Sequence, residues 1–435
     1  MKLARISVFV IVLLLGGCAS NDTYRTSTEL CEFSQAMDCS QSSLQVSNQG
    51  RDNEYRLGFV EYDDQGQLRL VQQQQKLVNY YNQLAAEGDV ILLTFVHGWH
   101  HSAAPGDLNV RKFRQILSEV SANETVHSKK EKRDKRKVLG VYVGWRGDSI
   151  DVDYLNVVTF WDRKSTAHDI GILGITSLLL DLEEIVNVQA GLKGAANSSR
   201  MVVIGHSFGG AVLFDSVKKV LADRFVNSTR GKVDTGIAEG FADLVVLINP
   251  AFEALRYASL FDLSQRECRS YFPGQLPKLA VMTSETDYAT KLAFPFGRFF
   301  STLFESHKTI KRHYCQATGN AGKVMFDFDE GEADRTTIGH YDNYLTHRLE
   351  PIEKSRLETL SNIEIQSAWF SQKIEQSIEL FEHVKLLPKN RATALNPFMN
   401  IEVDQRIMDG HNDIWSEEVV GFILDLIRLS VTPAN

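Results

Sequence analysis

The chain has 435 residues, a formal net charge of −8 and 43% apolar residues. This composition is typical of a globular protein with a large core, and the excess of acidic groups argues against nucleic acid as the main partner. The one basic run, residues 129–137, also contains acidic residues. We interpret it as a solvated loop, with a patch that contacts lipid headgroups as the alternative.

The N-terminus has the features of a bacterial lipoprotein signal. Two basic residues precede an apolar run from Ile6 to Leu15, which is too short to span a bilayer. A Leu-Gly-Gly-Cys sequence ending at Cys18 resembles a lipobox, whose cysteine is lipidated and becomes the mature N-terminus. In this resemblance, Ala19 favours the outer membrane, facing the periplasm. The sequence predicts a signal peptide over 1–17 and a lipid anchor; an ordinary signal peptide with an incidental cysteine is the alternative.

Four further cysteines suggest disulfide bonds, because an even number in an exported protein is typical of a disulfide framework. They are Cys31, Cys39, Cys268 and Cys315. Of the three connectivities, we favour Cys31–Cys39 and Cys268–Cys315, since the members of each pair are close in sequence. No cysteine falls in a Cys-x-x-Cys pattern, so zinc and thiol redox chemistry are not expected.

The polar segment 18–53 predicts a tether between the lipid and the folded domain. A turn signal at residues 63–66 predicts a hairpin of 55–61 and 67–71. Further along, we expect strands at 90–96, 138–143, 201–204, 244–248, 279–282 and 398–403, and helices at 77–86, 108–120, 167–193, 211–225 and 417–429. This alternation predicts an α/β domain over 54–435, with a mostly parallel, doubly wound sheet covered by helices on both faces.

Residues 288–397 do not follow this alternation and predict an insertion before the last strand. They contain a helical stretch near 369–384 and a cluster of aromatic residues: Phe294, Phe296, Phe299, Phe300 and Phe304. We interpret the segment as a cap over the site, with packing of the aromatic residues against the core as an equal alternative.

The sequence Gly205-His206-Ser207-Phe208-Gly209 lies between a predicted buried strand and a predicted helix. Strand, tight turn and helix form the context that a nucleophile elbow requires, and it exposes the serine hydroxyl at the carboxyl edge of a sheet. We therefore predict Ser207 as a nucleophile.

A serine nucleophile needs a base within hydrogen-bonding distance and an acid that orients the base. In elbow enzymes the chain order is serine, acid, histidine. Asp287, after the fifth strand of the parallel series, is the preferred acid, with Glu285 and then Glu253 as alternatives. His411 is the preferred base because it precedes the closing helix, and His340 is its alternative.

The developing oxyanion needs backbone donors, and loss of one typically lowers the rate about 10²- to 10³-fold. The expected donors are the N–H of Phe208 and the N–H of Trp99, which follows His97 and Gly98 after an early strand. Three nearby histidines, His97, His100 and His101, are an alternative metal site, but no matching carboxylate or cysteine set accompanies them. No metal or cofactor is expected.

Together these motifs resemble the serine α/β-hydrolases of the esterase and lipase type, over residues 55–435. The resemblance implies an eight-stranded, mostly parallel sheet and hydrolysis of a carboxylic ester, small or lipid-like, through an acyl-serine intermediate. Residues 145–147, 249–253 and 287–298 look like further motifs of a bacterial subgroup. The long insertion before His411 departs from the pattern.

The sequence is compatible with three functions. The first is an esterase of the bacterial envelope. Acyl transfer, or cleavage of a thioester or amide, is the second, since no acceptor signature is visible. The third is a hydrolase-fold lipoprotein that only binds a partner, against which the intact serine, acid and histidine argue. The sequence gives no oligomeric state.

Overall fold

The structure is a computed structural model. It describes residues 23–33, 37–145, 174–194, 197–229, 237–268, 271, 274–301, 305–315, 322–352, 362–371, 377–379, 381, 383–389, 393 and 395–432. The predicted signal peptide and Cys18 lie outside the described residues, as do residues 146–147 of the motif at 145–147. Among the described residues, no helix is long and apolar enough to cross a membrane.

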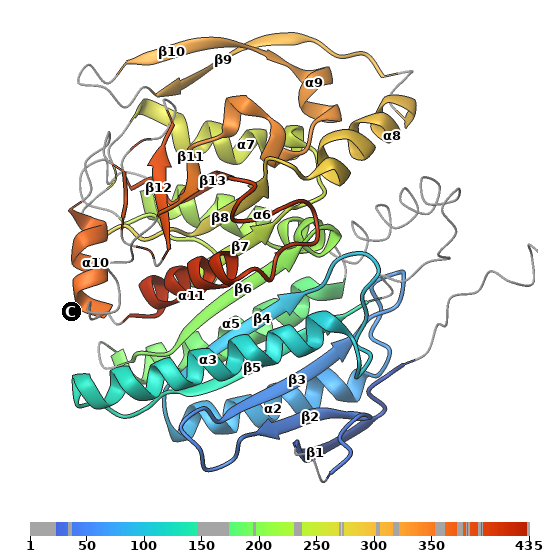
Figure 1. Ribbon diagram of the computed structural model, residues 1–435, viewed down its shortest axis with the longest axis vertical. Helices are drawn as coiled ribbons and strands as arrows, with labels where there is room; N and C mark the ends of the chain where they lie inside the picture. Colours follow the sequence, from blue (N-terminus) through green and yellow to red (C-terminus); the bar gives the residue numbers. More distant parts are fainter. Residues whose placement is uncertain are drawn as a thin grey trace, which may run out of the picture.

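An 11-stranded sheet forms the centre of the molecule (Figure 1). Its strands, in spatial order, are β1 (Ser27–Phe33), β2 (Ser42–Ser47), β3 (Tyr55–Glu61), β5 (Lys137–Gly144), β4 (Val90–Val96), β6 (Arg200–His206), β7 (Leu244–Ile248), β8 (Leu279–Ser284), β13 (Phe398–Val403), β11 (His347–Pro351) and β12 (Val384–Pro388). Only the pairs β2–β3 and β11–β12 are antiparallel in this sheet. A separate antiparallel pair consists of β9 (Thr309–Cys315) and β10 (Lys323–Asp329).

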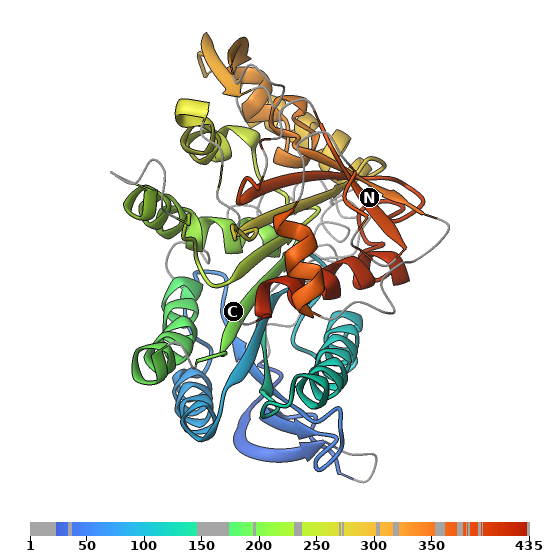
Figure 2. The ribbon, with the colours of Figure 1, turned by 90° about the vertical axis from the view of Figure 1, so that its left-hand side faces the viewer.

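Helices cover both faces of the sheet, as its parallel strands require. They are α2 (Val71–Glu87), α3 (Leu108–Glu131), α5 (Thr176–Lys193), α6 (Phe208–Thr229), α7 (Ala254–Gln265), α8 (Phe294–Ser301), α9 (Glu330–Arg335), α10 (Asn362–Phe370) and α11 (Glu417–Val431). Figure 2 shows α2, α5 and α6 along one face and α3 and α11 along the other. The fold is therefore α/β with a mostly parallel sheet, as the alternation of elements predicts.

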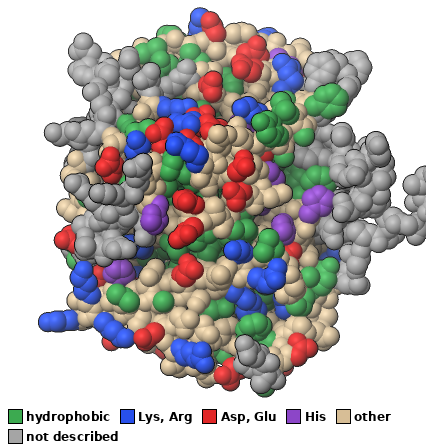
Figure 3. Space-filling view, viewed as in Figure 1, with side chains coloured by type: hydrophobic (Ala, Val, Ile, Leu, Met, Phe, Trp, Pro, Cys, Tyr) green, Lys and Arg blue, Asp and Glu red, His purple; other side chains and the backbone are tan. Residues whose placement is uncertain are grey.

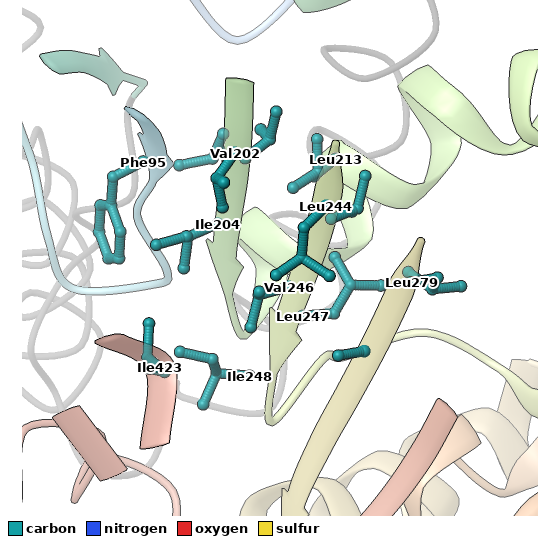
Figure 4. Packing of buried hydrophobic residues seen from close by; sticks show 14 of the residues in the cluster. Phe95, Val202, Ile204, Leu213, Leu244, Val246, Leu247, Ile248, Leu279 and Ile423 are labelled. Carbon is teal, nitrogen blue, oxygen red and sulfur yellow. The ribbon is translucent and has the colours of Figure 1, made fainter. Parts of the chain in front are cut away.

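The central strands β4, β6 and β7 carry the core. Every residue of β4 and β7 is buried, because both faces of these strands are covered. Figure 4 shows side chains of β6 and β7 packed between Leu213 of α6 and Ile423 of α11. These strands hold the turns at their carboxyl ends in fixed positions.

The strand order also fixes where a site can form. After β4 the chain forms β5 on one side of β4, and it then returns to form β6 on the other side. In open parallel sheets, ligands bind outside the carboxyl ends of strands at such a reversal. The loops after β4 and β6, which carry Trp99 and Ser207, meet at this place.

The N-terminal segment differs from the predicted tether, because Ser27–Phe33 and Ser42–Ser47 extend the sheet as β1 and β2. β2 is fully buried despite its polar sequence. Its polar side chains find partners inside the fold; Gln45 Nε2, for example, donates to the carbonyl oxygen of Cys39 at 2.8 Å. Such internal hydrogen bonds cannot be predicted from amino-acid composition.

The predicted hairpin of 55–61 and 67–71 forms only at its turn, where the Asp63 N–H donates to the Gln67 carbonyl oxygen and the Arg69 N–H donates to that of Glu61, both at 2.8 Å. β3 instead pairs antiparallel with β2 and parallel with β5. The second segment forms only a single bridge, Tyr62 to Leu68, before α2 begins at Val71. The number of strands is also larger than the eight that the resemblance implies.

The segment 288–397 is only partly an insertion. β11 and β12 extend the main sheet beyond β13, whereas β9 and β10 form the separate pair. The helical stretch expected near 369–384 begins and ends earlier, as α10. Polar and short strands at the edge of a sheet give a weak pattern, which is why they escape prediction.

The basic run 129–137 is not a solvated loop throughout. Its first residues end α3, and Arg136 is buried, with Nη2 2.7 Å from an Oε2 oxygen of Glu124. Arg133 pairs with the same carboxylate. These hydrogen bonds and charges lower the pKa of Glu124 to about 2, although burial alone would raise it.

Both predicted disulfides are confirmed, Cys31–Cys39 and Cys268–Cys315. The Cα atoms of each pair lie 5.8 and 5.1 Å apart, within the usual range for a disulfide. Disulfides persist in oxidising compartments, so they suggest an extracytoplasmic location.

Candidate active site

Ser207 occupies the turn between β6 and α6 with a φ of +55°. This left-handed conformation is uncommon for a residue with a side chain and marks a strained turn. The turn is held from β7 and the loop after it: the Ser207 N–H donates to the carbonyl oxygen of Ile248 at 2.9 Å, and its own carbonyl accepts from Ala251 at 3.1 Å. A side chain at Gly209 would place its Cβ 2.2 Å from the Val96 carbonyl oxygen, so the turn requires glycine there.

His411 lies in the loop between β13 and α11 and contacts the serine. Its Nε2 atom is 2.8 Å from Ser207 Oγ, and its Nδ1 atom is 2.9 Å from Asp287 Oδ2. A carboxylate only accepts, so Nδ1 carries the proton and Nε2 can take the proton of the hydroxyl. The structure therefore brings together Ser207, His411 and Asp287.

Asp287 follows β8 and is fully buried. Burial raises the pKa of Asp287, but the charge of His411 and hydrogen bonds from His411 and Thr290 outweigh it, so that the pKa is lowered overall. Thr290 supplies two donors: its N–H is 3.1 Å from Asp287 Oδ1, and its hydroxyl bonds Oδ2. An ionised carboxylate thus remains available to the imidazole.

His340, the alternative base, does not contact Ser207. Its Nε2 atom is 3.0 Å from the Thr290 hydroxyl oxygen. Because that hydroxyl donates to Asp287, it must accept from His340, and Nε2 carries a proton. Burial lowers the pKa of His340. His340 is therefore joined to the acid through Thr290 and has no hydrogen bond to the serine.

The alternative acids lie elsewhere. Glu285 pairs with Arg348 at 2.9 Å and accepts from the backbone of Gln405. Glu253 is buried and pairs with Arg256 and Arg298 at 2.9 and 3.2 Å. Both carboxylates are satisfied by arginine and do not contact His411.

The loop after β4 approaches the serine closely. A Cβ on Gly98 would lie 2.9 Å from Ser207 Cβ, so only glycine fits. His97 accepts the Trp145 N–H at its Nε2 and, from Nδ1, donates to the Gly98 carbonyl oxygen at 2.8 Å. Carbonyl and N–H point in opposite directions across a trans peptide, so the Trp99 N–H points away from His97.

Three histidines of this loop region do not form a metal site. Both ring nitrogens of His97 bind backbone groups, and burial lowers the pKa of His97 to about 4, which keeps the ring neutral. His101 pairs with Asp107 at 3.2 Å, and the ring of His100 stacks on Trp99. Among the described residues, the only cluster with metal-ligand spacing is Glu305, His307 and Asp334, and Arg298 already binds Asp334 there.

The His411 backbone accepts two hydrogen bonds that were not predicted from the sequence. The His411 carbonyl oxygen accepts from Asn249 Nδ2 at 2.9 Å and from His206 Nε2 at 3.0 Å. Asn249 also accepts from the Ser284 N–H, which ties the His411 loop to the end of β8. Burial, with the nearby His411, lowers the pKa of His206 to about 3, so this ring is neutral.

Several of these supports belong to motifs that the sequence singled out without a role. Trp145 holds His97, Asn249 holds the His411 loop, and Thr290 holds Asp287. The partners of Trp145 and Asn249 are 48 and 162 positions away, so these contacts could not be recognised beforehand. Thr290 is only three residues from Asp287 and lies in the same motif.

Removal of the Thr290 hydroxyl is expected to lower kcat/KM by about 10- to 100-fold, the effect of losing a hydrogen bond to a charged group. In Thr290→Val, Asp287 loses one donor and attracts the protonated His411 ring more strongly. The acidic limb of the pH–rate profile should therefore move to higher pH. Exposed Thr309 supplies the control, Thr309→Val, which should leave both the rate and the profile unchanged.

A purely structural role of Thr290 predicts a different result. The melting temperature would fall, and the pH–rate profile of the remaining activity would keep its wild-type position. That outcome would contradict a role of Thr290 in positioning the acid.

Comparisons with protein-family models, curated proteins and solved structures found no match to this chain. The proposal of a function therefore depends on the fold and on the geometry of the site.

Proposed function

We propose that the protein is a serine hydrolase of the bacterial envelope that cleaves carboxylic esters, with the α/β-hydrolase fold. The observation that carries this proposal is the continuous chain of hydrogen bonds from Ser207 Oγ to His411 and on to Asp287, at 2.8 and 2.9 Å. The strained turn at Ser207 and its place at the reversal of strand order support it.

In the proposed reaction, Ser207 Oγ attacks the acyl carbon while His411 Nε2 takes the hydroxyl proton. The bond between the acyl carbon and the alkoxy oxygen then breaks, and the alcohol leaves with that proton. Water repeats the sequence on the acyl-serine, and the acid and the enzyme are released. Asp287 stabilises the protonated ring of His411 throughout.

The oxyanion would be held by two backbone donors. One is the N–H of Phe208, which follows Ser207 as the first residue of α6. The other is the N–H of Trp99, whose peptide is oriented by the hydrogen bond between His97 and the Gly98 carbonyl. Such donors fixed before the reaction need no reorganisation in the transition state.

We further propose that Cys18 is lipidated and holds the enzyme at the outer membrane, facing the periplasm. The lipobox-like sequence that ends at Cys18 supports this, and the two disulfides agree with an oxidising compartment.

A series of p-nitrophenyl esters of increasing chain length tests the activity. We expect the wild type to hydrolyse at least one member, and Ser207→Ala to lower kcat/KM by about 10⁴-fold or more. Product analysis with an added alcohol separates hydrolysis from acyl transfer. If Ser207→Ala keeps the wild-type rate, or if no ester is cleaved by the folded protein, the proposal fails.

A further inference from the structure

The chain enters the fold at the same edge of the sheet as the candidate active site. The N–H groups of Tyr24 and Arg25 donate to the carboxylate of Glu61, the last residue of β3, at 3.0 and 2.8 Å. Arg25 Nε donates to the carbonyl oxygen of Ala103, in the loop after β4 that also contains Trp99. Figure 1 shows β3, β4 and β5 pointing toward the side where the chain enters β1.

This entry point is held firmly. The Arg25 side chain is 1% exposed, lies over the Phe59 ring at 4.0 Å and also bonds the carbonyl oxygen of Ser40. Five strand spacings separate β1 from β6, so the start of β1 lies about 24 Å from the strand that carries Ser207. The position at which the N-terminal segment leaves the fold is therefore fixed relative to the site.

The segment between the proposed lipid and this point is short. Cys18 precedes Tyr24 by six residues, which span at most about 22 Å when fully extended. The amino edge of the sheet lies one strand length, about 20 Å, from the carboxyl edge. Even fully extended, the segment only just spans that length, so a lipid surface that holds Cys18 approaches the amino edge only at full extension, whereas it reaches the carboxyl edge without it.

Exposed apolar side chains are present at the same carboxyl edge. Tyr288, Leu292 and Phe296 follow Asp287 at intervals of four residues and are 64%, 61% and 59% exposed. Figure 3 shows hydrophobic side chains at the margin of the molecule where α8 lies in Figure 1. Side chains of this kind favour a lipid interface over water.

The charged residues at this edge do not favour binding to anionic lipid. Asp63 and Asp64 follow β3, and Asp409 follows β13, so all three lie at the carboxyl edge, with Lys291 as a cation on the apolar segment. A contact made by the tether and by apolar side chains should form on neutral lipid and should depend little on salt.

We propose that the lipid surface that holds the anchor lies against the carboxyl edge of the sheet, where Tyr288, Leu292 and Phe296 contact it. The Ser207 site then takes amphiphilic esters that are held in that surface. This inference rests on the proposed function and on lipidation of Cys18, and it adds the orientation of the enzyme and the class of its substrate.

The first test measures orientation without measuring catalysis. The full-length lipidated protein, bound to phosphatidylcholine vesicles, carries a polarity-sensitive dye on Leu292→Cys. Leu192→Cys is the matched control, since Leu192 is 75% exposed and lies at the end of α5, near the amino edge. We expect a blue shift of dye emission on vesicles at position 292 and none at position 192. Equal shifts at both positions, or none at position 292, would overturn the orientation.

The second test measures the substrate class. In the double variant Leu292→Glu and Phe296→Glu, we expect at least a 10-fold lower rate on a long-chain p-nitrophenyl ester held in the vesicles. The rate on soluble p-nitrophenyl butyrate should stay within 2-fold, and Leu192→Glu should change neither rate. An equal loss on both esters, or no loss on the vesicle ester, would overturn the substrate class. If the wild type cleaves neither ester while position 292 shows its blue shift, the proposed function fails and the orientation stands.

Discussion

Replacement of His411 with alanine is expected to lower kcat/KM for a p-nitrophenyl ester by about 10⁴- to 10⁶-fold, the effect of removing the base from a serine triad. The reason is geometric: His411 Nε2 is 2.8 Å from Ser207 Oγ and is the group that can accept the hydroxyl proton. Steady-state kinetics on folded variants, with melting temperatures alongside, measure the effect.

The control for this experiment is His340→Ala. Its ring is joined to Asp287 through Thr290 and does not contact Ser207, so the expected loss is about 10-fold to 100-fold, as for a lost hydrogen bond near a charge. The double variant of His411 and Ser207 should be no slower than either single variant, because members of a triad act as a unit. A larger loss in His340→Ala than in His411→Ala would show that the wrong histidine has been assigned as the base.

Asp287→Asn is expected to lower kcat/KM by about 10⁴-fold, although the two side chains have nearly the same shape. The carboxylate of Asp287 accepts from three donors: His411 Nδ1, the Thr290 N–H and the Thr290 hydroxyl. An amide has one accepting oxygen, so its NH₂ group must face one of these donors. The His411 ring would then lose the proton arrangement that leaves Nε2 free to act as the base.

The control for Asp287 is the nearby carboxylate Glu285. Glu285→Gln should keep kcat/KM within about 3-fold, because this side chain pairs with Arg348 and is only partly buried. If Glu285→Gln lost more activity than Asp287→Asn, the assignment of the acid would be contradicted.

The central strands are the part of the fold that the sequence predicts best. The ranges 90–96, 244–248 and 398–403 agree with β4, β7 and β13 at both ends. β4 and β7 are buried on both faces, so a nearly continuous apolar run marks their limits. β13 also contains Asn400 and Glu402, and its apolar residues still mark its limits. β2 was not predicted because its buried polar groups are satisfied by hydrogen bonds inside the fold, and composition does not show such partners. β1 was not predicted because it is a polar, largely exposed strand at the edge of the sheet.

The candidate site likewise depends partly on a contiguous sequence motif and partly on contacts between distant segments. Ser207 stands out because the strand, turn and helix around it are contiguous in the sequence. The choice between His411 and His340 depends on which ring reaches Ser207 Oγ, and this follows from packing between segments far apart in the chain. For the same reason Asn249, which holds the His411 carbonyl across 162 positions, could not be given its role beforehand.

Covalent labelling of the folded wild-type protein with a fluorophosphonate, followed by peptide mapping, tests whether Ser207 is an activated nucleophile. An activated serine reacts with this probe, whereas an ordinary surface serine does not. We expect one label per chain, located on Ser207, with labelling lost in Ser207→Ala and strongly slowed in His411→Ala. Absence of any label on the folded protein, with a known serine esterase labelled alongside, or a label on another residue, would contradict this expectation.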